Sequence, residues 1–241
     1  MIEVTALRKT FGSVVAVEEV TFRAPDGRIT GILGPNGAGK TTTLRVLSGM
    51  LQPDRGEARI DEVDVVADPN AGRARLGLLP DARGLYPRLT ARENIRYYGE
   101  LYGLRGKTLD RRIEELIEML ELGHVADRAA TGFSQGERMK VAIARALVHD
   151  PPNVILDEPT NGLDVMSIRS LRGFLARLRE DGRCVLFSSH VMQEVSALCD
   201  SIVIVAKGRV VASGSEDELK AQTGAETMED VFVALATGEA P

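Results

Sequence analysis

The chain has 241 residues, and its 30 basic and 35 acidic side chains leave a formal charge of −5. A hydrophobic fraction of 44% and a charged fraction of 27% indicate an ordinary globular protein and exclude a disordered or fibrous one. The longest stretch without a charged residue is Ile29–Gly39, 11 residues, against roughly 20 for a membrane-spanning helix. We therefore expect no membrane-spanning segment and, without a basic-then-apolar start, no secretion signal.

The distribution of charge and the two cysteines indicate whether the chain has a nucleic-acid partner or a cysteine metal site. Residues 214–241 contain seven acidic side chains and one Lys, so the other 213 residues carry a net charge of +1. This balance does not indicate a nucleic-acid-binding surface, and we expect no nucleic-acid partner. Cys184 and Cys199 lie in apolar contexts without metal-ligand spacing, which is typical of reduced core thiols.

Short apolar runs alternate with helical patterns along most of the chain. The first 30 residues differ, because alternation over Glu3–Leu7 and Val15–Phe22 predicts an antiparallel β layer. The later alternation of strands with helices predicts an α/β fold with a mostly parallel sheet. The predicted strands are Ile29–Leu33, Leu76–Leu79, Val154–Leu156, Val185–Ser188 and Ile202–Ala206. The predicted helices are Thr41–Met50, Gly136–His149, Ser167–Glu180 and Met192–Leu198.

Residues 82–130 interrupt this alternation. Two amphipathic patterns, Leu89–Leu101 and Leu109–Leu122, predict a pair of helices. Thr90 has Glu93 three residues later, the spacing of a capping box at a helix start. We therefore expect a helical subdomain inserted at this point.

We expect residues 1–241 to form a single domain around this insertion. The acidic tail over residues 214–241 contains two short helical patterns, Ser215–Lys220 and Thr227–Ala236. They predict two closing helices with a solvated acidic surface.

A glycine-rich loop between a predicted strand and a predicted helix carries the clearest chemical signal. Gly34–Thr41 matches the phosphate-binding pattern G-x-x-x-x-G-K-[ST]. Glycines let backbone N–H groups curl around phosphate, Lys40 reaches the β- and γ-phosphates, and the Thr41 hydroxyl binds Mg²⁺. A chance match is disfavoured, since the chain has 24 Arg but only 6 Lys. The expected nucleotide contacts here are Gly34, Pro35, Asn36, Gly37, Ala38, Gly39, Lys40, Thr41 and Thr42.

A second strand ends in adjacent carboxylates. Val154–Leu156 leads directly into Asp157 and Glu158. An acidic residue at such a strand end holds Mg²⁺ in phosphate-loop proteins, which suits Asp157. Glu158 is placed to polarise the water that attacks the γ-phosphate. Taken without the loop, the two carboxylates fit surface charge as well as a site, but together with it they favour a hydrolytic nucleoside triphosphate site.

Three further features resemble one family of phosphate-loop proteins. Phe133–Glu137 opens a helix before the acidic strand, Asn161–Asp164 follows Glu158, and His190 follows the strand Val185–Ser188. Their order and spacing resemble the ATP-binding subunit of ABC transporters over nearly the whole chain.

The resemblance implies a role for each of these residues. It implies that Asp157 is the Walker B aspartate, Glu158 the catalytic glutamate and His190 the residue that senses the γ-phosphate. Asp164 would lie in the loop that contacts a second subunit. Phe11, 23 residues before Gly34, matches the aromatic position that stacks on adenine. Ser134, Gln135 and Gly136 match the signature motif, which contacts the nucleotide held by that second subunit.

The chain departs from the family pattern at several positions. Phe133, Gln135 and Glu137 replace the first, third and fifth residues of the usual Leu-Ser-Gly-Gly-Gln, and the carboxylate of Glu137 must point away from phosphate or weaken its binding. Asp81 stands where Gln is common; a carboxylate still accepts from metal-bound water but cannot donate. Asp81 and the tail segment Met228–Phe232 resemble the branch that includes sodium-efflux and drug-efflux ATPases.

Two functions remain open at this point. In the first, the chain hydrolyses Mg-ATP as a homodimer or paired subunit and drives an integral-membrane permease that contacts the helical subdomain. It would then be cytoplasmic and peripheral on the inner face of the cell membrane. In the second, a soluble ABC-type ATPase moves a non-membrane partner. A nucleotide kinase would leave Ser134, Asp164 and His190 unexplained, and no guanine-reading motif indicates a GTPase.

Overall fold

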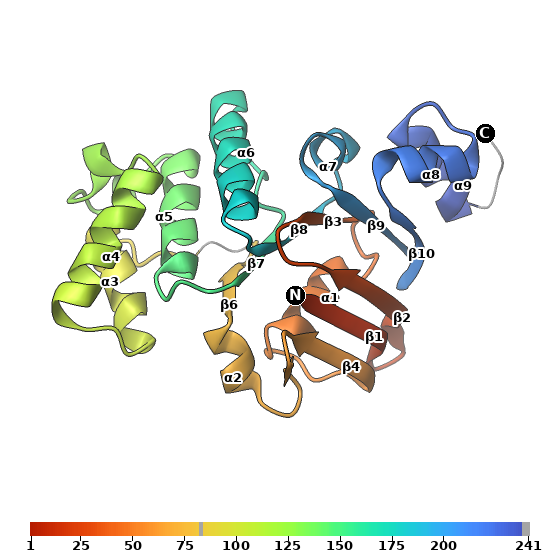
Figure 1. Ribbon diagram of the computed structural model, residues 1–241, viewed down its shortest axis with the longest axis horizontal. Helices are drawn as coiled ribbons and strands as arrows, with labels where there is room; N and C mark the ends of the chain where they lie inside the picture. The colour runs from red at the N-terminus through yellow and green to blue at the C-terminus, as the bar shows by residue number, and fades with distance from the viewer. Residues whose placement is uncertain (82–83, 238–241) are drawn as a thin grey trace.

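The computed structural model describes residues 1–81 and 84–237, which form a mixed α/β molecule around one long curled sheet (Figure 1). Its strands are β1 (Ile2–Phe11), β2 (Val14–Ala24), β3 (Ile29–Leu33), β4 (Arg55–Ile60), β5 (Val63–Asp64), β6 (Leu76–Leu79), β7 (Asn153–Asp157), β8 (Cys184–Ser189), β9 (Ser201–Ala206) and β10 (Arg209–Gly214). Its α-helices are α1 (Lys40–Leu47), α2 (Pro69–Ala74), α3 (Ala91–Leu101), α4 (Gly106–Met119), α5 (Gln135–Leu147), α6 (Val165–Glu180), α7 (Met192–Leu198), α8 (Glu216–Thr223) and α9 (Met228–Thr237).

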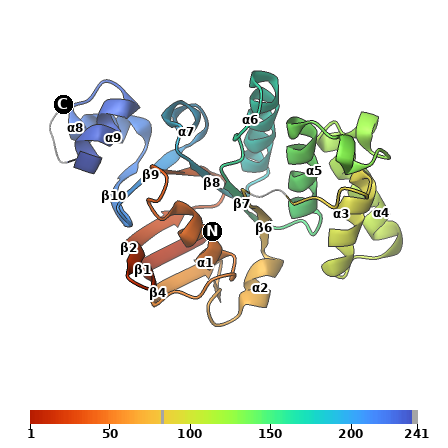
Figure 2. The ribbon, with the colours of Figure 1, turned by 180° about the vertical axis from the view of Figure 1, so that it is seen from behind.

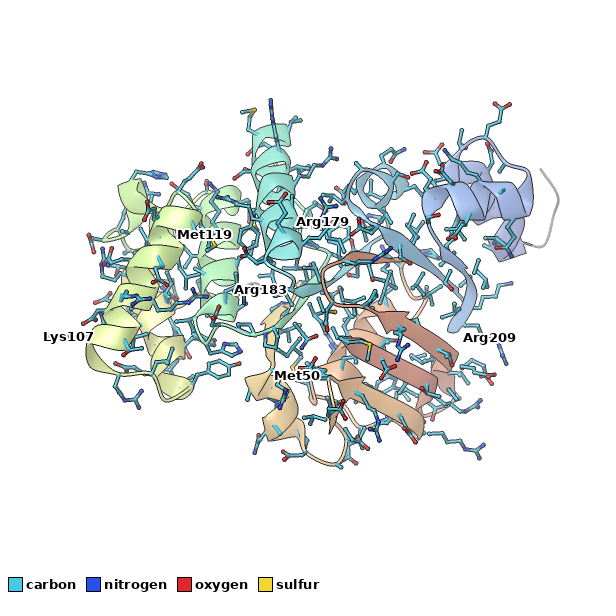
Figure 3. The ribbon with its side chains drawn as sticks, viewed as in Figure 1. Met50, Lys107, Met119, Arg179, Arg183 and Arg209 are labelled. Atoms are coloured by element: carbon cyan, nitrogen blue, oxygen red, sulfur yellow. The ribbon has the colours of Figure 1, made fainter. Side chains whose placement is uncertain are left out.

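The sheet combines an antiparallel part with a parallel one, as the sequence predicts. Its strand order over the described residues is β5-β4-β1-β2-β10-β9-β3-β8-β7-β6. Strands β1, β2 and β4 pair antiparallel, whereas β3, β8, β7 and β6 are parallel neighbours. The two parts meet where β10 pairs with β2, and there Arg209 forms ion pairs with Glu18 and Glu19 at 3.5 and 3.2 Å (Figure 3).

The parallel strands are buried on both faces, which explains their continuous apolar runs. In β7, Val154 and Leu156 belong to the core shared with the helices of one face. Ile155 belongs to a second core, formed with α1 and the antiparallel strands. Helix α1 contacts β2, β4 and β7, so it is enclosed between the two parts of the sheet.

Helices α3, α4 and α5 pack together beyond β6, at the opposite end of the molecule from α8 and α9 (Figures 1 and 2). Thr90 and Glu93 form the predicted capping box at the start of α3. In α4 the buried side chains Leu109, Ile113 and Leu116 recur at helical spacing, so one stripe of this amphipathic helix faces the core.

Four elements were not predicted from the sequence: β4, β5, α2 and β10. They are short or polar; only Ala58 and Ile60 of β4 are buried, and its strand geometry comes from pairing with β1. Helix α1 ends at Leu47, earlier than predicted, because Gly49 adopts a positive φ of 66°. Of the residues described, no helix combines the length and apolar character needed to cross a bilayer.

Candidate active site

The candidate site lies at the carboxyl edge of the parallel strands. The loop from Gly34 follows β3, His190 follows β8, Glu158 follows β7, and Asp81 comes shortly after β6. Since these four strands are neighbours in the order β3-β8-β7-β6, their following residues meet at one edge of the sheet. The fold therefore gathers side chains that are far apart in the sequence.

The loop after β3 packs too tightly for larger residues. A Cβ atom on Gly34 would lie 2.3 Å from the carbonyl oxygen of Val205, and one on Gly39 would lie 2.5 Å from that of Ala16. Gly39 also has a φ of 103°, which disfavours any residue with a side chain. Helix α1 begins at Lys40 without a side-chain cap, so its first backbone N–H groups are available to an anion.

Lys40 and Glu158 form a buried ion pair. The Lys40 Nζ atom lies 3.1 Å from Glu158 Oε1 and donates hydrogen bonds to the carbonyl oxygens of Gly34 and Pro35 at 2.7 and 3.3 Å. The two side chains are 5% and 10% exposed. The other Glu158 oxygen lies 2.9 Å from His190 Nδ1. Because an ionised carboxylate only accepts, His190 Nδ1 is the donor of that bond.

Asp157 is held by two hydroxyl groups. Ser188 Oγ donates to Asp157 Oδ1 at 2.6 Å, and Thr41 Oγ1 donates to the same oxygen at 3.4 Å. Ser188 Oγ also accepts from the backbone N–H of Glu158 at 3.0 Å, so one serine links β8 to the Asp157 carboxylate and to the Glu158 backbone. Ser188 was not predicted from the sequence. The feature that could have indicated it is a polar residue at the end of the apolar run of β8.

A hollow of about 480 Å³ opens over the loop. It is lined by Val14, Val15, Ala16, Pro35, Asn36, Gly37, Gly39, Lys40, Thr41, Thr42, Asp81, Glu158, Asn161 and His190. A smaller hollow of about 130 Å³ beside it joins Thr41, Asp81 and Asp157. Most of the loop, metal and hydrolysis residues expected from the sequence thus share one region.

Phe11 and the Ser134–Gly136 segment lie outside the lining of that large hollow, as far as the described residues show. The Phe11 ring is 49% exposed, at the far end of β1, with Lys9 Nζ 5.6 Å from its centroid. Gln135 lines a separate hollow with Asp81 and Asn161.

Glu137 turns back onto the start of α5. Its Oε2 accepts from the Ser134 backbone N–H at 2.7 Å and from Arg128 at 2.8 Å, and its Oε1 lies 3.3 Å from His124. Burial acts to raise the pKa of Glu137, but the bonds from Ser134 and the charge of Arg128 outweigh it and lower the pKa. The carboxylate is therefore engaged by its own helix cap and by the Arg128 guanidinium.

Comparison with known proteins identifies the family. A family model described as ABC transporter matches residues 17–161, more than half of the chain. The chain belongs to the ABC transporter family. It is accordingly an ABC-type ATP-binding domain and ATPase.

Relatives from bacteria are similar to this chain over nearly all of its length. The ABC transporter ATP-binding protein NatA of Bacillus subtilis is 42% identical over 91% of this chain and 90% of its own. The daunorubicin resistance ATP-binding protein DrrA3 of Streptomyces coeruleorubidus is 36% identical over 96% of this chain and 73% of its own. The probable multidrug ABC transporter ATP-binding protein YbhF of Escherichia coli is 35% identical over 98% of this chain, which spans only 41% of YbhF.

Solved structures agree with the fold. The ATP-binding subunit of an ABC transporter superposes with a TM-score of 0.88 at 31% identity, covering 98% of this chain and 99% of that one. A dimeric ATP-binding cassette in a post-hydrolysis state, bound to ADP and phosphate, gives 0.81 at 27% identity over 89% and 98%.

Proposed function

We propose that this chain is the ATP-hydrolysing subunit of an exporter and pairs with a second copy around two ATP molecules to drive a separate membrane subunit. The observation that carries the proposal is the meeting of Lys40, Glu158 and His190 above the glycine loop. The names of relatives support export, since they include linearmycin resistance, daunorubicin resistance and Nod factor export proteins.

The triphosphate binds in the loop between β3 and α1. The backbone N–H groups of Gly34–Thr41 and the N-terminus of α1 surround the phosphates, and Lys40 leaves Glu158 to bind the β- and γ-phosphate oxygens. Thr42 lines the same hollow and contacts the α-phosphate side. The adenine lies over the β1–β2 turn, where Phe11 stacks on it and Val14 and Val15 are exposed beneath it.

Glu158 acts as the general base for hydrolysis. It accepts a proton from water as the water oxygen attacks the γ-phosphorus, the bond to the bridging oxygen of ADP breaks, and inorganic phosphate is released. His190 holds one carboxylate oxygen of Glu158 through its Nδ1–H, and in its imidazolium form the opposite ring nitrogen carries a second N–H that can donate to the γ-phosphate. Both residues therefore act by placing and stabilising the reacting groups.

The oxygen atoms beside the loop fit Mg²⁺. The Thr41 hydroxyl, the Asp157 carboxylate and the Asp81 carboxylate border one small hollow, and such hard oxygen donors suit Mg²⁺ in phosphate sites. These three residues would hold the ion, which neutralises charge on the β- and γ-phosphates when bound. Ser188 keeps Asp157 oriented toward Thr41.

A second copy completes each site. Ser134, Gln135 and Gly136 at the start of α5 lie away from their own loop and reach the γ-phosphate held by the other copy. A Cβ atom on Gly136 would lie 2.5 Å from Ser167 Oγ, so this segment sits against the start of α6. Val165 and Met166 are exposed there, directly after Asp164, and would be covered by the partner.

The membrane subunit would contact the helical subdomain, residues 82–130. This part of the chain exposes large apolar and aromatic side chains, among them Tyr86, Tyr97, Leu101 and Tyr102. Met50, which lies beside α2, is also exposed (Figure 3). Binding there would place the chain on the cytoplasmic face of the cell membrane.

Two measurements test the proposal. The Lys40→Ala variant should lose tight ATP binding and turnover, and unchanged turnover would overturn the assignment of the loop. Purification from membranes should recover the chain with an integral-membrane protein. Recovery only in a soluble complex would favour the non-membrane ABC ATPase and contradict the transport role.

A further inference from the structure

We infer that Glu194 is a positioning residue for hydrolysis, which fixes the segment after Glu158 against the segment before His190. The inference rests on the roles proposed above for Glu158 and His190. The three side chains that carry it are Glu194, Thr160 and Ser189, which we call the Glu194 clamp. None of them was singled out by the sequence.

One carboxylate oxygen joins the two segments. Glu194 Oε2 accepts from Thr160 Oγ1 at 2.6 Å and from Ser189 Oγ at 2.9 Å. The three residues are 9%, 5% and 0% exposed, so water competes little for these bonds. A short bond from a hydroxyl to a carboxylate is stronger than a neutral one, and a buried one is costly to break.

The two hydroxyls stand next to the reacting groups along the chain. Thr160 lies two residues after Glu158, and Ser189 directly precedes His190. Ser189 Oγ also accepts from the Val191 backbone N–H at 3.0 Å, which fixes the chain on the other side of His190. The clamp therefore holds the chain beside Glu158 and beside His190, whose side chains lie 2.9 Å apart.

The backbone at Glu158 needs this support. Glu158 has a φ of 47°, in the left-handed region. This conformation is unfavourable in free energy for a residue with a side chain, and it persists only where the surrounding structure enforces it. On the β8 side, the Glu158 N–H donates to Ser188 Oγ. On the following side, Asn161 N–H donates to the Glu158 carbonyl at 3.2 Å, and Thr160 is tied to Glu194. Loss of the clamp leaves the second half of this turn without its side-chain anchor.

The clamp acts on hydrolysis and spares ATP binding. Its three residues lie outside the lining of the hollow over the phosphate loop, in the part of the chain that the structure describes. Displacement of Glu158 by even about 1 Å is enough to lower turnover by roughly a hundredfold. The phosphate loop is tied to Ser189 through the backbone, since Gly34 N–H donates to the Ser189 carbonyl oxygen at 3.4 Å, and loss of a side-chain hydroxyl keeps that bond. A fall in kcat with an unchanged KM is therefore the signature of the clamp.

The decisive variant is Thr160→Val, which removes the hydroxyl and keeps the shape. We expect kcat to fall by roughly ten- to a hundredfold while the KM for ATP stays within about twofold. Thr160→Ser keeps the hydroxyl and should retain most of kcat. Thr30→Val is the matched control, since Thr30 is fully buried and its hydroxyl has no hydrogen-bond partner among the described residues. That control should match the unmodified chain.

The possible outcomes separate the clamp from the proposed function. The clamp would be overturned if Thr160→Val had the same kcat as the control Thr30→Val. It would also be overturned if Thr160→Val and Thr160→Ser lost kcat equally. A KM that rises with the loss of kcat would overturn it too. If Thr160→Val does not fold, Ser189→Ala provides the same test, because it removes the other hydroxyl that donates to Glu194. An unmodified chain without ATPase activity would instead contradict the roles of Glu158 and His190.

Discussion

The Lys40 ammonium group lies 3.1 Å from the Glu158 carboxylate, with both side chains buried at the base of the glycine loop. Lys40 also donates to the Gly34 carbonyl oxygen at 2.7 Å, and the other Glu158 oxygen contacts His190 at 2.9 Å. A triphosphate that binds the loop must draw Lys40 away, because its oxygens carry more negative charge than one carboxylate. In the function proposed above, Glu158 is then released to face the γ-phosphate, so the ion pair and the proposed hydrolytic arrangement exclude each other.

Replacing Glu158 by Gln should separate binding from hydrolysis. The neutral amide competes less for Lys40, so we expect the dissociation constant for Mg-ATP to stay the same or fall by a few fold. Turnover should drop by at least about a hundredfold, the usual contribution of a general base. Equilibrium titration with a fluorescent ATP analogue and a phosphate-release assay measure the two effects.

The same variant should accumulate as a dimer with Mg-ATP, which gel filtration detects. Glu57→Gln makes the same change at an exposed carboxylate on β4 and should behave like the unmodified chain. Weaker ATP binding by the Glu158 variant, or turnover near the original rate, would contradict the role given to the ion pair. A monomer alone in the presence of Mg-ATP would count against the shared site.

Phe11 should contribute to recognition of the base and leave recognition of the phosphates unaffected. Its ring is half exposed and has Lys9 nearby, as an adenine-stacking position requires. Phe11→Ala should weaken ATP binding by about 1 kcal/mol, roughly fivefold, and Phe11→Tyr should restore it. Inorganic tripolyphosphate, which has no base, should bind the Phe11→Ala variant with unchanged affinity, and a competition assay measures this. Equal weakening of both ligands would show that the substitution disturbs the loop instead.

His149 should make the folded state less stable in mild acid. Burial lowers the pKa of His149 to about 4, from an ordinary value of 6.5. Its ring stacks on Tyr102, with 3.6 Å between centroids, and its Nε2 lies 3.2 Å from the Leu76 carbonyl oxygen. Between these two pKa values the unfolded chain binds a proton that the folded chain does not, so stability rises with pH.

The free energy of unfolding should therefore fall by about 1–2 kcal/mol from this residue between pH 7 and pH 5. Urea unfolding at the two pH values measures the difference. His149→Gln should remove this part of the pH dependence. His124→Gln, at an exposed position, should retain it. An identical pH dependence in the His149 variant and the unmodified chain would contradict this account.

Local sequence patterns predicted those elements whose bounds depend on residues close together in the chain. Strand β3, strand β6 and helix α7 begin and end at the predicted residues, because apolar periodicity and glycine are local properties. The capping box of Thr90 was predicted for the same reason. Strand β10 was missed although it forms a hairpin with the preceding β9, because only its Ala212 is buried and its apolar pattern is weak.

Motifs and their spacing are enough to show that a phosphate loop, two adjacent carboxylates and a histidine are present in the order of an ABC ATPase. Which of these residues touch depends on how the strands are arranged in the folded chain. Thr41 and Asp157 are 116 positions apart, and Ser188 reaches Asp157 across 31. Strand order places such residues together at one edge of the sheet, whereas periodicity describes only a residue's own element. The Glu194 clamp shows the same division, since Thr160 is 34 positions from Glu194 and reaches it only in the folded chain.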